Sequence, residues 1–304
     1  MYYPERLPDH NKLDWSHQDF FSSEELCYVT AAVMSEHAFY MHRHQFYEIN
    51  VIAQGTGRHY IENRSYDAPV GCVFPLPPGI RHGYYSHEVI HAYHIMLHRA
   101  FFEQYARELK NLPGYTLLFE IEPYLRREAG HPLFLTLEGD KMVSFREEMH
   151  KLLDLCGMQI GGIQVLKNIE ALQIIAMLSR WISSHHHLDE RTRDRKYSLE
   201  IVRSMEYIQM HFTEKLSIDF LARQANLSRS TYLQYFQEIC RCTPAKYQLT
   251  CRLKLAKKYL RFTAMTVTEI AQECGFYDSS HFIRCFEQSE GLRPMAYRAQ
   301  LEKP

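Results

Sequence analysis

Two histidines and a glutamate lie close together in the stretch MHRHQFYEINVIAQG, residues 41–55. Alternate residues of a β-strand share one face, so a strand here would direct His42, His44 and Glu48 to the same side. A further histidine, His82, follows the segment GCVFPLPPGIR, which we expect to lead into a paired strand. Three imidazole nitrogens and one carboxylate oxygen could bind iron, manganese, nickel or zinc. The same side chains could instead hydrogen-bond a small polar ligand.

The spacing of these side chains resembles the paired sequence motifs of cupin barrels. The first motif matches as His42, one residue, His44, three residues, Glu48, six residues and Gly55. The second matches as Gly71, five residues, Pro77, one residue, Gly79, two residues and His82, with Ser86 where an asparagine is usual. In metal-dependent cupins these positions bind a divalent transition metal. The resemblance therefore implies His42, His44, Glu48 and His82 as a possible metal-ligand set.

Three interpretations of this cluster are open at this point. The first is a metal-dependent oxygenase or isomerase joined to a second domain. The second is a barrel without catalytic activity, whose polar side chains bind a small effector. The third is a set of polar residues that only stabilises the mouth of the barrel. The C-terminal third of the chain favours the second interpretation and makes catalysis the weakest of the serious alternatives.

The segment around these motifs is rich in hydrogen-bond donors and flat aromatic rings, which suit the hydroxyls and ring faces of carbohydrates. The sequence therefore predicts a sugar or an oligosaccharide as the effector. The predicted contacts are His42, His44, Glu48, His82, Tyr47, Arg43 and His94, and further candidates for the lining are Tyr40, His59, Arg81, His91 and Tyr93. Strand alternation would direct about half of such side chains to solvent.

The bulk properties of the chain are those of a globular protein. Its 304 residues exceed the usual size of one hydrophobic core, so we expect two domains. No apolar run approaches the roughly 20 residues of a transmembrane helix, and the first ten residues do not resemble a secretion signal. We therefore expect a cytoplasmic protein that does not bind membranes. The eight cysteines are scattered, which predicts reduced thiols, several of them in the core.

The net charge of −1 conceals an uneven distribution. Residues 1–190 carry 16 Lys and Arg against 24 Asp and Glu, whereas residues 191–304 carry 19 against 12. The C-terminal third is therefore basic and the rest acidic. A basic module suggests a polyanionic partner, although solvated helix faces would give the same count.

The hydrophobic pattern changes along the chain. From about residue 36 to residue 97, short runs rich in Tyr, Ile, Val and His alternate with Gly and Pro clusters, which predicts an antiparallel sandwich or barrel. Residues 101–109, 140–156 and 162–183 have helical spacing. The polar segment 183–198 is the best candidate for a linker, and its three consecutive histidines are more typical of solvated linker than of a metal site.

The last third of the chain contains an internal repeat. Phe236, Pro244 and Tyr247 recur 50 residues later as Phe286, Pro294 and Tyr297, while Leu221, Ala222 and Asn226 recur 49 residues later as Ile270, Ala271 and Gly275. The difference of one residue falls between the two helices of each unit, where a turn can absorb it. Each unit has the order of a helix-turn-helix.

Capping residues set the expected bounds of these helices. In the first unit we expect Ser217 to cap residues 218–225, Asn226 to adopt a left-handed conformation and Ser228 to cap residues 229–239. In the second we expect a capping box of Thr266 and Glu269 ahead of residues 267–274, a left-handed Gly275, and Asp278 as the cap of residues 279–288. A spacer helix over residues 245–263 should separate the units, with Arg252, Lys254, Lys257, Lys258 and Arg261 facing outward.

The second unit resembles the signature of AraC/XylS-type transcription regulators. The matching residues are Ala271, Gly275, Phe276, Phe282, Arg284, Phe286, Gly291, Pro294, Tyr297 and Arg298. Most of them specify the fold, so DNA contacts must come from the exposed faces between them. By analogy with the family, the candidates for base contacts are Ser230, Leu233 and Gln234 in the first recognition helix and Ser279, Ser280, His281 and Arg284 in the second, while Arg229 and Thr231 suit phosphate.

These observations predict an α+β protein: an N-terminal cupin-like antiparallel β-barrel with flanking helices, and a C-terminal all-α domain with two helix-turn-helix units. We assign residues 1–137 to effector sensing, 138–190 to a helical dimerisation and linker segment, and 196–304 to DNA binding. The resemblance implies a sequence-specific regulator, and activation through RNA polymerase is the family norm. We expect a homodimer that binds double-stranded DNA and a small-molecule effector, needs no cofactor and is not an enzyme. The alternative is a metal-dependent cupin enzyme fused to a DNA-binding domain.

Overall fold

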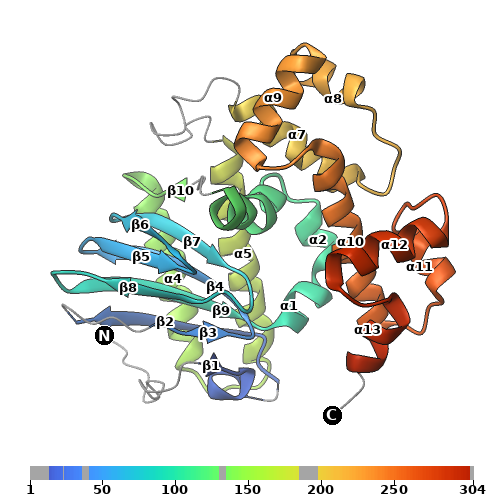
Figure 1. Cartoon of the computed structure of the whole chain (residues 1–304). Helices are drawn as coiled ribbons and strands as arrows, with labels where there is room; N and C mark the ends of the chain where they lie inside the picture. Colours follow the sequence, from blue (N-terminus) through green and yellow to red (C-terminus); the bar gives the residue numbers. More distant parts are fainter. Residues whose placement is uncertain (1–13, 23, 36–40, 130–134, 185–197, 302–304) are drawn as a thin grey trace. The chain divides into compact units, whose positions relative to one another are not determined.

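The computed structural model describes residues 14–22, 24–35, 41–129, 135–184 and 198–301. It divides the chain into two compact units, Met1–Arg195 and Lys196–Pro304 (Figure 1). Tyr40, the three histidines at 185–187 and most of the predicted linker lie outside the described residues.

Two antiparallel sheets form the barrel of the first unit. The larger sheet has the strand order β10-β7-β4-β9-β2 and the smaller the order β6-β5-β8. The bounds in the larger sheet are β2 Cys27–Met34, β4 Tyr47–Gln54, β7 Cys72–Leu76, β9 Ile90–Leu97 and β10 Leu135–Thr136. Those in the smaller sheet are β5 Gly57–Ile61, β6 Arg64–Ala68 and β8 His82–Tyr85. The short strands β1 (Asp14–Trp15) and β3 (Arg43–His44) pair in parallel beside them. The predicted barrel is confirmed.

Side chains from both sheets meet in a common interior. Ile52 of β4, Phe74 of β7, Ile61 of β5 and Tyr84 of β8 belong to one buried cluster. An isolated bridge between His42 and His82 also ties the predicted metal motifs together. Because alternate residues of β4 face this interior, Glu48, Asn50 and Ile52 point inward, and the residues between them point the other way.

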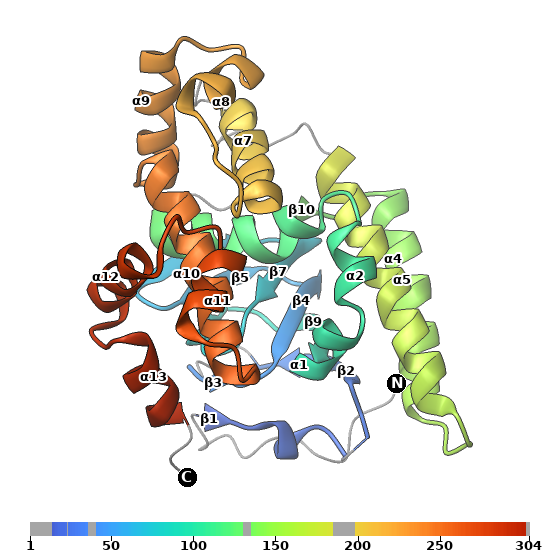
Figure 2. The same ribbon diagram turned by 90° about the vertical axis from the view of Figure 1, so that its right-hand side faces the viewer.

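Helices cover the outer face of the larger sheet (Figure 2). These are α1 (Arg99–Gln104), α2 (Ala106–Lys110), α3 (Glu122–Tyr124) with π-helical turns at Leu117–Ile121 and Leu125–Ala129, α4 (Asp140–Cys156) and α5 (Ile163–Ser184). Tyr93 of β9 meets Phe145 of α4 with ring centroids 5.8 Å apart. The helix α5 packs along α4 and buries Ile174, Ile175 and Leu178. At its N-terminal end it leaves Val165, Leu166 and Ile169 exposed.

The second unit contains seven helices in its described part. They are α7 (Ser198–His211), α8 (Ile218–Gln224), α9 (Arg229–Cys240), α10 (Pro244–Phe262), α11 (Val267–Glu273), α12 (Ser279–Glu290) and α13 (Pro294–Leu301). The predicted caps are confirmed: Ser217, Ser228 and Asp278 accept backbone N–H groups, and Thr266 with Glu269 forms the capping box. Asn226 and Gly275 have φ angles of 53° and 77°, as the repeat predicts.

Polar side chains of α10 bind the loop before α8 and are not all solvated. The outward position predicted for Arg252 is wrong, because its guanidinium donates to the carbonyl oxygens of Phe212 (2.6 Å) and Glu214 (2.8 Å), in the loop before α8. Gln248 donates to the same two carbonyls. Gly275, in the turn of the second helix-turn-helix, approaches this loop so closely that a Cβ would lie 2.0 Å from the carbonyl oxygen of Thr213. The loop that precedes the first helix-turn-helix is therefore fastened both to α10 and to the turn of the second helix-turn-helix.

Among the described residues, the structure contains no helix that is long and apolar enough to cross a membrane. Five of the eight cysteines are buried, in agreement with the prediction of core thiols.

Candidate functional sites

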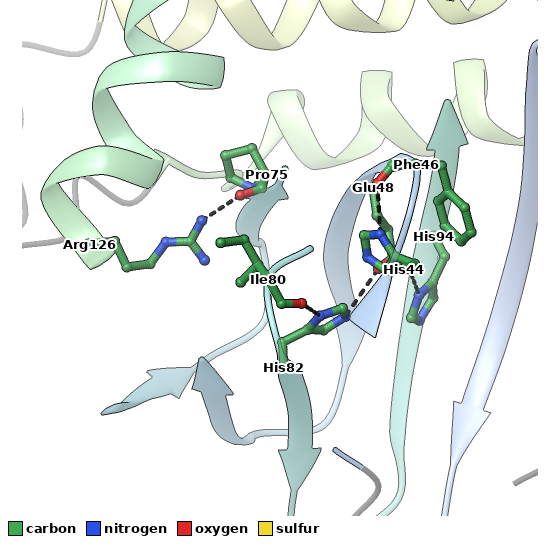
Figure 3. Close-up of polar contacts among 8 residues, drawn as sticks. All are labelled: His44, Phe46, Glu48, Pro75, Ile80, His82, His94 and Arg126. Carbon is green, nitrogen blue, oxygen red and sulfur yellow. Dashed lines mark hydrogen bonds and ion pairs between the residues drawn. The ribbon is translucent and has the colours of Figure 1, made fainter. Parts of the chain in front are cut away.

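Glu48 is the centre of a buried polar cluster inside the barrel (Figure 3). Its Oε2 lies 3.0 Å from Nε2 of His44 and 3.2 Å from Nε2 of His82, and its Oε1 lies 2.6 Å from Nδ1 of His94. These side chains come from β4, β3, β8 and β9, so the barrel brings together residues up to 50 positions apart in the chain. Burial alone would raise the pKa of Glu48, but its contacts with the three histidines hold it well below its usual value.

The protons of two of these histidines are fixed by backbone carbonyls. Nδ1 of His44 lies 2.7 Å from the carbonyl oxygen of Phe46, and Nδ1 of His82 lies 3.1 Å from that of Ile80. A carbonyl oxygen only accepts, so each Nδ1 carries a proton. In the neutral tautomer both Nε2 atoms therefore present lone pairs toward the same oxygen of Glu48. Lone pairs on three neighbouring atoms repel one another, so a proton or a cation is needed between Oε2 of Glu48 and the two Nε2 atoms.

The cluster offers ligand atoms for a metal ion. Within the described ranges, one group of His, Cys, Asp and Glu side chains has ligand atoms all within 4.8 Å of one another, and it consists of His42, Glu48 and His82. The carbonyl bonds at Nδ1 of His82 and of His44 are of the kind that orient metal-binding imidazoles. His44, the fourth predicted ligand, lies beside Glu48 but outside this group.

A second set of polar atoms lies in the interior of the same barrel. Within the described structure, the side-chain oxygen and nitrogen of Asn50, both ring nitrogens of His59, the hydroxyl of Tyr84 and Nε2 of His94 are buried without a hydrogen-bond partner. His59 stacks on Tyr84 with centroids 4.0 Å apart. Burial lowers the pKa of His59 and raises that of Tyr84, so both side chains are neutral at physiological pH. Buried polar atoms in native proteins nearly always have partners, which indicates a bound polar molecule or water.

Asn50 and Tyr84 were not among the residues predicted from the sequence. Strand parity could have identified them, since Asn50 stands two positions after Glu48 and Tyr84 two positions after His82.

Two predicted effector contacts do not reach this interior. Tyr47 is adjacent to Glu48 in β4, so it points to the opposite face, where its ring lies 4.2 Å from that of Phe102. Arg43 stands between His42 and His44 in the sequence and is exposed, with its guanidinium paired to Asp14. Their positions follow from the same alternation that buries their neighbours.

A buried charge pair lies beside β7. Arg126 is 2% exposed and donates to the carbonyl oxygen of Pro75 in β7 (Figure 3). Its Nε lies 3.0 Å from Oε1 of Glu122. Burial raises the pKa of Glu122 to about 7 in spite of this guanidinium. The pair therefore supplies a positive charge that is only partly neutralised near neutral pH.

The predicted DNA contacts lie on the outer faces of α9 and α12. Six of them are exposed: Arg229, Ser230, Gln234, Ser280, His281 and Arg284. Thr231, Leu233 and Ser279 are half-buried. The residues between them, including Tyr232 and Phe236 in α9 and Phe282 and Phe286 in α12, are fully buried. Each recognition helix thus has one core face and one exposed polar face.

Some of these side chains already have partners within the unit. Arg229 donates to both carboxylate oxygens of Asp219, at 2.8 and 3.0 Å. Gln234 donates to Glu238 at 2.9 Å. Both pairs are exposed, so water or a phosphate can replace the carboxylate at little cost.

Comparison with known proteins gives two family matches. The model of an AraC-like ligand binding domain matches residues 28–191, and that of a helix-turn-helix domain matches residues 221–300. The chain is 25% identical over 282 residues to the HTH-type transcriptional activator RhaS of Escherichia fergusonii, covering 92% of this chain and 95% of the relative. It is 23% identical to RhaS of Mannheimia succiniciproducens, covering 92% and 97%. Among solved structures, ToxT from Vibrio cholerae aligns over 92% of this chain and all of its own, with 13% identity and a TM-score of 0.36.

Proposed function

Because the chain belongs to the family with an AraC-like ligand binding domain, we propose that it is a transcription regulator that senses a small molecule. Its second unit would bind duplex DNA in a sequence-specific manner, and its first would bind the effector inside the barrel. The similarity to RhaS activators along nearly the whole chain supports activation as its mode of action. A protein with this function acts in the cytoplasm.

The effector that best suits the barrel is a neutral, polyhydroxylated molecule such as a sugar or an oligosaccharide. The observation that carries this proposal is the set of buried polar atoms without partners on Asn50, His59, Tyr84 and His94. They combine donors and acceptors with the flat faces of His59 and Tyr84, which is the chemistry that recognises sugar hydroxyls and ring faces. A ligand that satisfied these atoms would remove the cost of burying them unpaired, which is about 1 to 3 kcal/mol for each group.

Calorimetric titration of the purified chain with neutral sugars, sugar acids and fatty acids tests this proposal. We expect saturable binding of a neutral sugar, at least tenfold weaker binding in Asn50→Ala, and unchanged binding in Tyr47→Phe, whose side chain lies on the opposite face of β4. If only a sugar acid bound saturably, its carboxylate would be recognised by Arg126 instead. Binding of a fatty acid alone, or an effect of Tyr47→Phe equal to that of Asn50→Ala, would contradict the proposal.

The DNA-contacting residues that we propose are Arg229, Ser230, Thr231, Leu233, Gln234, Ser279, Ser280, His281 and Arg284. Their support is their position on the solvent-facing sides of two capped recognition helices. Binding of the full chain to random duplexes, followed by selection from a randomised pool, would test the function. A chain that bound duplex DNA with no enrichment of any sequence would be an architectural protein rather than a regulator.

A divalent transition metal is a second candidate ligand of the barrel. The observation that favours it is the pair of Nε2 lone pairs, from His44 and His82, directed at one oxygen of Glu48. His42, Glu48 and His82 would hold the ion, which would supply Lewis-acid chemistry or a structural link between the sheets. Elemental analysis of the wild type and His82→Ala would detect it. Stoichiometric metal together with turnover of a substrate would instead support the metal-dependent enzyme.

We further propose that the active species is a homodimer that contacts RNA polymerase. The support for the dimer is the exposed apolar surface at the N-terminal end of α5, made by Val165, Leu166 and Ile169 with Met158 and Ile160 of the preceding loop. A two-fold axis would bring two such surfaces together. Effector binding in the barrel would then bias how the DNA-binding unit is presented.

A further inference from the structure

The second helix-turn-helix carries little positive charge for ion pairing with the DNA backbone. Residues 266–290 contain one arginine, Arg284, and five carboxylates. Four of those carboxylates lie on the exposed surface. The nearby cations are partly committed, since Lys257 pairs with Glu290 at 3.1 Å and Arg293 with Glu287 at 3.4 Å. A cation here can reach a phosphate only by leaving its carboxylate, so neutral donors are favoured as further phosphate contacts at this unit.

One neutral donor has no counterpart in the first helix-turn-helix. Leu227 N donates to Ala222 O, and 49 residues later Phe276 N donates to Ala271 O, each at 2.9 Å. The caps Ser228 and Asp278 are instead separated by 50 positions. The additional residue of the second turn is thus Tyr277, and its side chain is 98% exposed.

The neighbours of Tyr277 hold it in place without covering it. Phe276 is buried beneath the guanidinium of Arg252, whose Cζ lies 5.7 Å from the ring centroid. Asp278 accepts the N–H of His281 at 2.7 Å and so fixes the start of α12. Its carboxylate occupies the N-terminal end of the helix, where a phosphate would otherwise find free N–H groups. A phosphate near this end must find another donor.

We propose that Tyr277 contacts the sugar–phosphate backbone of bound DNA, at the edge of the groove that α12 enters. Its hydroxyl donates a hydrogen bond to a phosphate oxygen, and its ring packs on a deoxyribose. This inference rests on the proposed DNA-binding function. The N-terminal turn of a recognition helix lies in the major groove, so the residue just before its cap lies where the backbone passes. Backbone contacts set the position of the helix but carry no base information.

A neutral donor leaves a distinctive signature in binding data. Loss of a cationic phosphate contact flattens the dependence of log K on log salt concentration by about one unit, because one fewer counterion is released. A neutral hydroxyl displaces no counterion when it contacts a phosphate, so its removal leaves the salt dependence of binding unchanged. Tyr277→Phe should therefore weaken binding about 3- to 10-fold, equally for all sequences, with an unchanged salt slope.

The experiment measures fluorescence anisotropy of the full chain with two labelled duplexes, one random and one selected from a randomised pool by the wild type. The variants are Tyr277→Phe, Tyr277→Ala and the control Met210→Ala, whose 70% exposed side chain lies at the end of α7, outside both helix-turn-helix units. We expect Tyr277→Ala to bind both duplexes more weakly than Tyr277→Phe, and Met210→Ala to match the wild type.

Each outcome decides the inference. Equal affinity of wild type and Tyr277→Ala would overturn it, as would a loss confined to the selected duplex, which would make Tyr277 a base reader. A flatter salt slope in Tyr277→Phe would also contradict it. If the wild type bound neither duplex, the proposed function itself would fail. Thermal unfolding of each variant verifies that the substitution leaves the fold intact, as expected for an exposed side chain.

Discussion

The ion pair between Arg229 and Asp219 shows how single residues set the affinity of the DNA-binding surface. Both side chains are more than half exposed, so the pair contributes little to stability. On DNA, the guanidinium must exchange this carboxylate for a phosphate. Asp219→Asn should therefore strengthen binding to random duplexes. It removes the partner that competes with phosphate for Arg229, and it removes a negative charge that the DNA phosphates repel.

Arg229→Ala should weaken binding to all sequences and flatten the salt slope by about one unit. Titrations at several salt concentrations measure both effects, and a loss limited to one operator would contradict the phosphate role.

Arg284 is the arginine best placed to read a base. It is exposed on α12, one turn after His281, and an arginine can form two hydrogen bonds to guanine. Arg284→Ala should cost about 1 to 3 kcal/mol at a selected site and relax the preference for one base. Repeating the selection from a randomised pool with the variant provides the measurement, with Arg261→Ala, exposed at the end of α10, as the control. An unchanged base preference would exclude Arg284 as a reader.

At the scale of elements, Gly275 packs the turn of the second helix-turn-helix against the loop that precedes α8. Its φ of 77° disfavours any side chain, and a Cβ would also lie 2.0 Å from the carbonyl oxygen of Thr213. Gly275→Ala should lower the free energy of unfolding by about 2 kcal/mol or more. Gly291 is the matched control, since its φ is 72° but nothing lies within 4 Å of its Cβ position. In Gly291→Ala the free energy of unfolding should therefore fall only by the cost of the backbone strain. Urea unfolding compares them, and equal losses would show that the approach to Thr213 contributes nothing.

The helix pair α4 and α5 contains two carboxyl groups that share a hydrogen bond, Glu148 and Glu170. Burial, and then the neighbouring carboxylate, raises the pKa of Glu170 to about 7, while the bond to Glu170 lowers that of Glu148. A pKa above the unfolded value means that the folded state binds the proton more tightly. This contribution to stability is present below the unfolded pKa and is lost as the pH rises through about 7.

Thermal unfolding should reveal this titration. The melting temperature of the wild type should fall as the pH rises from about 6 to about 8, and Glu170→Gln should reduce the fall, because an amide keeps a donor toward Glu148 at every pH. Glu147→Gln, an exposed change on α4, serves as the control. An identical pH dependence in all three proteins would exclude Glu170 as its source.

Local patterns predicted the elements well, and long-range contacts were harder to predict. The caps at Ser228 and Asp278 depend on residues within three positions, so spacing alone could identify them. The outward position predicted for Arg252 was wrong because its partners are backbone carbonyls 38 and 40 residues away in the sequence. A local sequence pattern cannot predict a contact over that separation. In the barrel, the motif spacing identified Glu48 and three of its neighbours. Tyr47 was assigned to the same face although strand parity directs it to the other.

At the scale of the whole molecule, acidic residues predominate in the sensing part of the chain and basic residues in the DNA-binding part. Residues 1–190 carry an excess of eight acidic groups and residues 191–304 an excess of seven basic ones. Within the second unit α10 is the most basic helix, with six Lys and Arg that include the exposed Lys254, Lys258 and Arg261, whereas residues 266–290 of the second helix-turn-helix contain only Arg284. This distribution suits a mode of binding in which α10 supplies general attraction to DNA and the recognition helices supply shape and base contacts.

The proposed homodimer gives the last prediction. An isolated globular chain rarely exposes contiguous apolar side chains such as Val165, Leu166 and Ile169. Ile169→Glu would bury a charge in each half of a two-fold interface, so it should convert a dimer to a monomer and raise the dissociation constant at least a hundredfold, which corresponds to about 3 kcal/mol. Val70→Glu, an apolar residue exposed to a similar extent in the turn before β7, should leave the dimer intact. Sedimentation velocity distinguishes the two variants. A wild type that remained monomeric at tens of micromolar, or a dimer equally disrupted by both changes, would exclude α5 as the interface.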